Sequence, residues 1–196
     1  RGLLKDMRDH GVRIRWYNPF APLFFLRISS FYFRDHRKML LVDNAVAHIG
    51  GVGVNPTMST WRDTHGRLVG PIARTIQASF LELWIKAKKP IPHLLSKPHP
   101  QPSTKPGAYE FLPNSPGKGR RFIYHAMRNA IQRAEEKIWI TMPYFIPDLK
   151  LFRTLRLAAR RGVDVRVILP DRSDVPILDA AMRSYFGMAL KSGIKL

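Results

Sequence analysis

The sequence of 196 residues lacks cysteine, which excludes a disulfide framework, thiolate catalysis and cysteine-based metal sites. Acidic residues are also few, with 14 Asp and Glu against 33 Lys and Arg, so the formal net charge is +19. No segment approaches the ~20 apolar residues that a membrane-spanning helix needs. A signal-peptide pattern is missing as well, and because the chain opens on Arg1 rather than on Met, we expect a trimmed chain or a fragment.

The excess of positive charge predicts an anionic partner, which leaves nucleic acid, an anionic lipid surface and a phosphorylated substrate as the classes to weigh. The lysines and arginines are spread along the chain rather than gathered in one tail, so most of them are expected on a solvated basic surface. Hydrophobic residues make up 45% of the chain, which is enough for a real core. Composition therefore indicates a globular protein that binds or processes anions.

Hydrophobic periodicity predicts an α/β fold. In the first half, apolar spacing and turn residues predict helices at 2–10 and 71–88 and strands at 12–17, 38–43, 45–49 and 61–69. In the second half, they predict helices at 121–136, 148–161 and 174–191 and strands at 137–142 and 163–169. Strands that alternate with helices of this length form parallel βαβ units, so we expect mixed, mostly parallel sheets flanked by helices.

Proline separates the two halves. The prolines between positions 90 and 106 are too dense for a helix or a central strand, which predicts a connecting segment. The predicted organisation is a first lobe at 1–89, a connecting segment at 90–120 and the start of a second, incomplete lobe at 121–196.

A short unit recurs within the chain. GVRIRW at 11–16 is echoed by GVDVRV at 162–167 and by GIKL at 193–196, and a helical stretch precedes each copy. The repetition predicts two related halves, each built from helix, glycine and strand. A counterpart of the stretch that follows the first copy would fall beyond Leu196.

That stretch, residues 34–55, carries the most reactive pattern in the chain. His36 and Lys38 are two residues apart, so on an extended strand both side chains leave the same face, while Arg37 points the other way. Lysine neutralises phosphoryl oxygens, and histidine can attack phosphorus or move a proton. The pair indicates phosphate-ester chemistry, with Asp43 five residues later.

Other interpretations compete with this one. A single His-x-Lys pair arises often by chance, and His65 is better explained as an ordinary strand histidine than as a neighbour in the site. IGGVGV lacks the full GxGxxG and the following helix of a nucleotide-binding turn. Without HExxH or clustered carboxylates, neither a metal site nor a cofactor is predicted. An aromatic segment at 20–33 is expected in the core, although it also suits contact with lipid.

The stretch resembles the HxKxxxxD motif of the phospholipase D superfamily, with the glycine pair following. RDHRKMLLVD, WRDTH, PYFIPD and RGVDVRVILPDRSD are similar to the bacterial cardiolipin synthase-like branch, and the resemblance covers nearly the whole chain. It implies His36 as nucleophile or general acid, Lys38 as phosphate anchor, Asp43 as a structural or orienting carboxylate, and Gly50 and Gly51 as glycines that admit the phosphate. Where the family has asparagine this chain has Gly53, and Asn55 is the residue that would replace it.

The resemblance also implies two lobes that share one site, each giving one HxKxxxxD motif, and the second motif is missing from these residues. The expected function is a phosphatidyltransferase or phosphodiesterase that acts on anionic phospholipid at a membrane face, by implication the bacterial inner membrane. Two alternatives stay open: a nucleic-acid phosphodiesterase with the same chemistry, and a lobe that binds lipid or phosphate without turnover. A second chain could complete the site by bringing two His36 side chains together.

Overall fold

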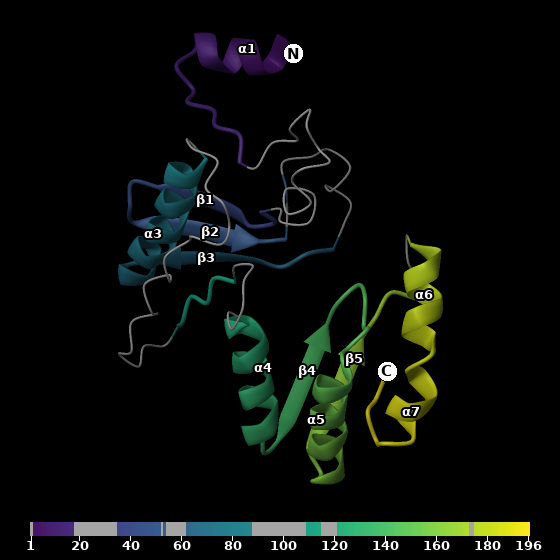
Figure 1. Ribbon diagram of the computed structural model, residues 1–196. Helices are drawn as coiled ribbons and strands as arrows, with labels where there is room; N and C mark the ends of the chain where they lie inside the picture. The colour runs from purple at the N-terminus through teal and green to yellow at the C-terminus, as the bar shows by residue number, and fades with distance from the viewer. Residues whose placement is uncertain are drawn as a thin grey trace. The chain divides into compact units, whose positions relative to one another are not determined.

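A computed structural model describes residues 2–17, 35–51, 53, 62–87, 109–114, 121–172 and 175–196 (Figure 1). The chain divides into two compact units, Arg1–Arg120 and Arg121–Leu196. The predicted α/β class is confirmed, and the sheets are mixed: one is antiparallel and the other parallel. Within the described ranges, no helix has the length and apolarity to cross a bilayer.

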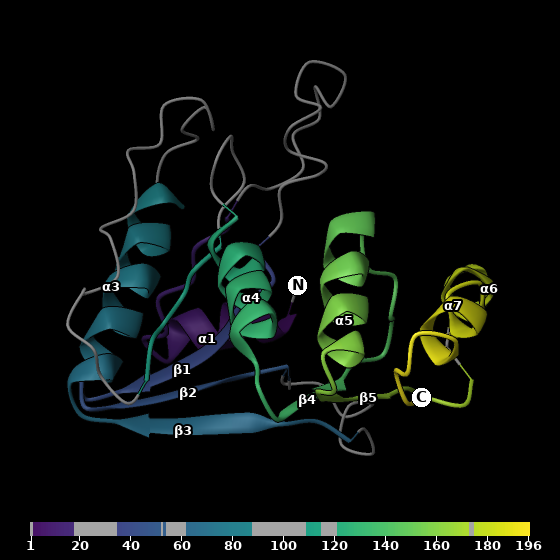
Figure 2. The same cartoon turned by 90° about the horizontal axis from the view of Figure 1, so that it is seen from below.

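The first unit is built on an antiparallel sheet in the order β1-β2-β3, with bounds Lys38–Val42, Val46–Gly50 and His65–Val69. Helix α3 (Pro71–Lys86) lies over one face of this sheet (Figure 2). Its inward side chains, Ala73 and Ile76, are fully buried and pack with Ala47 of β2. The strands predicted at 38–43 and 45–49 pair as a hairpin, the helix predicted at 71–88 is present, and helix α1 (Gly2–Asp9) precedes them.

The turn between β1 and β2 follows from two residues. Asp43 and Asn44 both have positive φ angles, +50° and +56°, and the Ala45 amide donates to the Val42 carbonyl at 3.1 Å. Two successive left-handed residues make a type I′ turn, whose twist matches that of the flanking strands. Asn and Asp are the non-glycine residues that best tolerate this conformation, so the dipeptide fixes the hairpin.

The second unit is a parallel βαβ arrangement, as predicted. Strands β4 (Lys137–Thr141) and β5 (Asp164–Ile168) pair in parallel and are connected through helix α5 (Leu149–Arg160). Helices α4 (Phe122–Arg133), α6 (Pro176–Arg183) and α7 (Phe186–Leu190) lie on the same side of the two strands as α5 (Figure 2). Their apolar faces form one core with Val165, Val167 and Ile194.

The three copies of the repeated unit share one backbone geometry. Gly11, Gly162 and Gly193 all have positive φ, between +83° and +93°, within three residues of the ends of α1, α5 and α7. In each copy the glycine amide bonds to the carbonyl three residues back, and the next amide bonds to the carbonyl five back. This is the Schellman arrangement, in which glycine avoids the strain that a Cβ would bring at positive φ. After Gly193 the chain bridges β5 in parallel, with Lys195 opposite Arg166.

Two predicted elements differ from the structure. Residues 12–17 form no strand, and within the described ranges no strand pairs with them; Val12 and Trp16 are exposed instead. Alternating side chains suit a strand, but a strand also needs a hydrogen-bonding neighbour. The single helix predicted at 174–191 is two helices, interrupted at Ser184, whose hydroxyl donates to the Ala181 carbonyl at 2.6 Å.

Candidate active site

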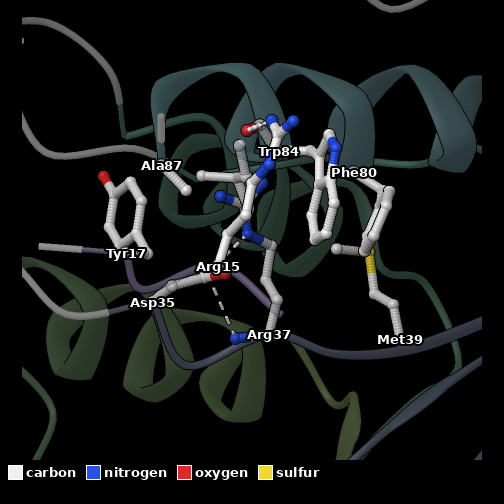
Figure 3. A pocket seen from close by; sticks show the side chains of 9 residues that line it. Arg15, Tyr17, Asp35, Arg37, Met39, Phe80, Trp84 and Ala87 are labelled. Carbon is white, nitrogen blue, oxygen red and sulfur yellow. Dashed lines mark hydrogen bonds and ion pairs between the residues drawn. The ribbon is translucent and has the colours of Figure 1, made fainter. Parts of the chain in front are cut away.

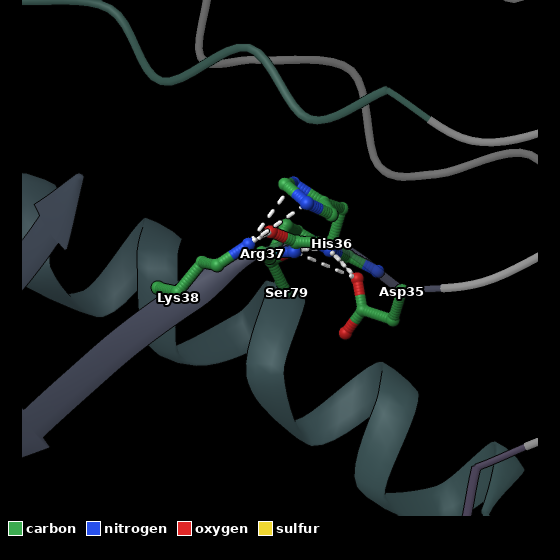
Figure 4. A network of polar contacts seen from close by, with 5 residues as sticks. All are labelled: Asp35, His36, Arg37, Lys38 and Ser79. Carbon is green, nitrogen blue, oxygen red and sulfur yellow. Dashed lines mark hydrogen bonds and ion pairs between the residues drawn. The ribbon is translucent and has the colours of Figure 1, made fainter. Parts of the chain in front are cut away.

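His36 and Lys38 lie in contact at the start of β1. The Lys38 ammonium nitrogen is 3.0 Å from each ring nitrogen of His36 and 3.0 Å from the His36 carbonyl oxygen (Figure 4). His36 is exposed, and Lys38 is half-buried. An exposed imidazole beside an ammonium is accessible to a phosphate ester, whose non-bridging oxygens the ammonium can neutralise.

Arg37, between them, points to the opposite face and fixes the segment. Its Nε donates to Asp35 at 2.8 Å, and its Nη1 donates to the Ser79 hydroxyl at 2.8 Å (Figure 4). Ser79 is buried on α3, and the side chains of Arg37 and Asp35 are largely covered, with 21% and 26% exposed. A charge-assisted pair in this setting is worth more than a surface ion pair. Arg37 therefore holds the backbone of His36 against α3.

Gly50 and Gly51 lie where the chain at the start of β3 packs closely against the end of β2. A Cβ on Gly50 would lie 2.7 Å from the Thr64 carbonyl oxygen and 2.9 Å from the His65 Cα, and one on Gly51 would collide with the carboxylate of Asp63. At Gly50 the close atoms belong to the backbone, so packing requires glycine there, whereas at Gly51 the close atoms belong to the end of the Asp63 side chain, which can move. The predicted role of Gly50 and Gly51 in binding phosphate stays a prediction.

The ring of His65 fills the space that a side chain on Gly50 would take, next to Lys38 in the sheet register. The sheet register places Lys38, Gly50 and His65 in one row across β1, β2 and β3, so their side-chain positions are on one face. Two strand spacings separate Lys38 from His65 by about 10 Å. The ring of His48 lies 6.1 Å from that of His65. This face, opposite α3, thus carries several groups able to meet an anion.

Asp43 lies at the other end of β1, in the type I′ turn, about 17 Å from Lys38 by the rise of a strand. The carboxylate of Asp43 is therefore not next to His36 and Lys38, and this position fits a structural role for Asp43 rather than a direct role in the chemistry. Gln77 of α3 donates to Asn44 and ties the same turn to the helix. Asn55 and the aromatic segment 20–33 lie outside the described residues.

A pocket of about 220 Å³ lies between α3 and the segment that leads into β1 (Figure 3). Its walls include Arg37, Tyr17 and Trp84, and the Arg15 guanidinium lies 4.2 Å above the Trp84 ring while donating to the Trp84 carbonyl at 2.6 Å. Burial, followed by the negative charge of Asp35, raises the pKa of Tyr17. The cationic groups of this pocket already have partners, so it is a packing feature rather than the reactive site.

Residues 127–196 match the family model described as Cardiolipin synthase, PLD-like domain. The chain is 36% identical to Cardiolipin synthase A of Pseudomonas entomophila (strain L48), over 97% of this chain and 40% of the relative. It is 34% identical to Cardiolipin synthase A of Pseudomonas fluorescens (strain SBW25), over 98% of this chain and 41% of the relative.

These matches are to the cardiolipin synthase-like part of the phospholipase D superfamily. The predicted resemblance to its cardiolipin synthase-like branch is confirmed over nearly all of the chain. The chain spans about 40% of the length of the curated relatives it matches. The matched segment 127–196 covers most of the second unit, whereas the HxKxxxxD motif of the superfamily is in the first.

Sequence reasoning missed the anchor formed by Asp35, Arg37 and Ser79. Strand alternation predicts only the direction of the Arg37 side chain, away from the face of His36 and Lys38. Its partner Ser79 is 42 residues further along the chain, on a helix predicted only from its apolar side. A buried polar residue on an apolar helix face is the signal that could have revealed it.

Proposed function

We propose that the protein is a phosphatidyltransferase of the cardiolipin synthase type, which transfers a phosphatidyl group between alcohols through a phosphohistidine intermediate. The observation that carries the proposal is the contact between His36 and Lys38, 3.0 Å apart, within the HxKxxxxD motif of a superfamily member. Relatives that bear the name cardiolipin synthase give the substrate class, anionic phospholipid.

The first step is a displacement at phosphorus. A neutral ring nitrogen of His36 attacks, the P–N bond forms, and the P–O bond to the first alcohol breaks. Lys38 offsets charge on the non-bridging oxygens. In the second step the acceptor alcohol attacks the same phosphorus, the P–N bond breaks, and the histidine is restored. Transfer to water would give hydrolysis instead.

The leaving alkoxide requires a proton, and the acceptor alcohol must later lose one. A second histidine is the suitable group for both transfers. The sequence through Leu196 holds one HxKxxxxD motif. We propose that the partner comes from a second motif elsewhere in the whole protein, or from His36 of a second copy, and that catalysis takes place at a bacterial membrane face.

The test is lipid turnover by the whole protein with His36 replaced by alanine. Loss of a covalent nucleophile should lower kcat by at least about 10³-fold. His125, an exposed histidine on α4, is the matched control, and His125→Ala should retain turnover. Retained turnover in His36→Ala would exclude this function, and cleavage of DNA or RNA without lipid turnover would favour the nucleic-acid alternative, which the named relatives do not favour.

A further inference from the structure

Helix α5 presents a cationic stripe on the side opposite its core face. Phe152, Leu155 and Ala158 are buried in the core. Lys150, Arg153 and Arg160 are exposed on the other side, at the spacing that aligns residues along a helix. We call these three residues, together with Leu149 and Leu157, the α5 stripe.

The cations of the α5 stripe differ from other cations of the same unit. Arg183 pairs with Asp179 at 2.7 Å, and Arg166 and Lys195 both pair with Asp164 at 2.7 Å. Within the part of the chain that the structure describes, the side chains of Lys150, Arg153 and Arg160 make no ion pair or hydrogen bond. Their charge is thus available to an external anion.

Two leucines accompany these charges. Leu149 is 80% exposed at the first residue of α5, and Leu157 is 45% exposed within the stripe, about 12 Å further along the axis. A nucleic-acid backbone attracts cations through its phosphates, but it does not bury exposed leucine side chains. An anionic bilayer offers phosphate to the cations and an apolar boundary to the leucines.

We propose that the α5 stripe docks this unit on an anionic bilayer surface. Lys150, Arg153 and Arg160 contact lipid phosphates, and Leu149 and Leu157 enter the headgroup boundary. The apolar core face of α5 stays packed in the protein, so the helix lies on the surface without inserting. The proposal concerns binding and does not depend on turnover at His36.

The test is cosedimentation of the 196-residue chain with vesicles of phosphatidylcholine that contain or lack phosphatidylglycerol. Replacing Lys150, Arg153 and Arg160 together by glutamine should weaken binding to the anionic vesicles on the order of 100-fold, about fivefold per charge. The control replaces Arg133, Arg172 and Lys191 by glutamine, which removes the same charge from exposed positions outside the stripe. The control should lose only a few-fold.

Leu149→Ser with Leu157→Ser is a second variant with unchanged charge. It should weaken the part of vesicle binding that survives high salt, because salt screens only the electrostatic part. Equal losses in the stripe variant and its control would overturn the proposal in favour of net charge alone. A loss of DNA binding without a loss of vesicle binding would also overturn it. Cosedimentation reads binding without turnover, so this test and that of turnover fail separately.

Discussion

At the scale of residues, the side chains at the start of β1 have different roles on its two faces. His36 and Lys38 are on one side, with their polar groups in contact, while Arg37 reaches the other side and bonds to Asp35 and Ser79. The proposed chemistry and the anchoring thus alternate along three consecutive residues, as the period of an extended chain dictates. Arg37 is in our account a positioning residue, because it fixes the backbone from which His36 projects.

Replacing Arg37 by lysine tests this task. Lysine keeps the charge but cannot bond to Asp35 and Ser79 together with a planar fork. If His36 loses its alignment, kcat for lipid turnover should fall between about 10-fold and about 100-fold, with little change in KM. Ser79→Ala removes one of the two bonds and should cause a smaller fall. A wild-type kcat in Arg37→Lys would show that the anchor does not position His36.

At the scale of elements, local backbone preferences decided which predictions from sequence were correct. The hairpin at Asp43 and Asn44 and the helix ends at Gly162 and Gly193 depend on residues that tolerate positive φ, so a few adjacent residues suffice to predict them. Residues 12–17 have an equally regular strand pattern, yet they form no strand in the structure. Strand formation depends on a neighbour, and a neighbour cannot be read from local alternation.

The edge of the parallel sheet supplies a test by pH. A hydrogen bond from Lys195, with others from Trp139 and Arg166, lowers the pKa of Asp164 from 3.8 to about 2. Because the folded pKa lies below the unfolded one, the stabilisation is complete above pH 3.8 and is lost as the pH falls toward 2. An NMR titration of the Asp164 carboxyl should have its midpoint near the lower value.

Lys195→Ala provides the control for that titration. Without the first of its hydrogen bonds, the Asp164 carboxylate should titrate at a higher pH than in the unchanged chain. A midpoint near 3.8 in the unchanged chain would contradict the described contact between β5 and the residues after Gly193.

At the scale of the whole molecule, the catalytic motif and the segment that matches the family model lie in different units. The first unit carries the HxKxxxxD motif, and the second carries the segment that matches the family model. The candidate site could be predicted from sequence because its reactive residues are close together and its motif is specific. The contact between Arg37 and Ser79 could not, because it joins residues 42 positions apart. The second histidine that the mechanism requires belongs to no motif in these residues.

The most direct measurement of the central claim is detection of the covalent intermediate. The whole protein is mixed with phosphatidylglycerol, quenched in alkali, in which phosphohistidine is stable, and digested for mass spectrometry. We expect a phosphoryl-containing adduct on the peptide that carries His36, and none on that peptide from His36→Ala. Turnover of lipid with the adduct on another residue, or with no adduct on His36 at any time, would contradict the assignment of His36 as the nucleophile.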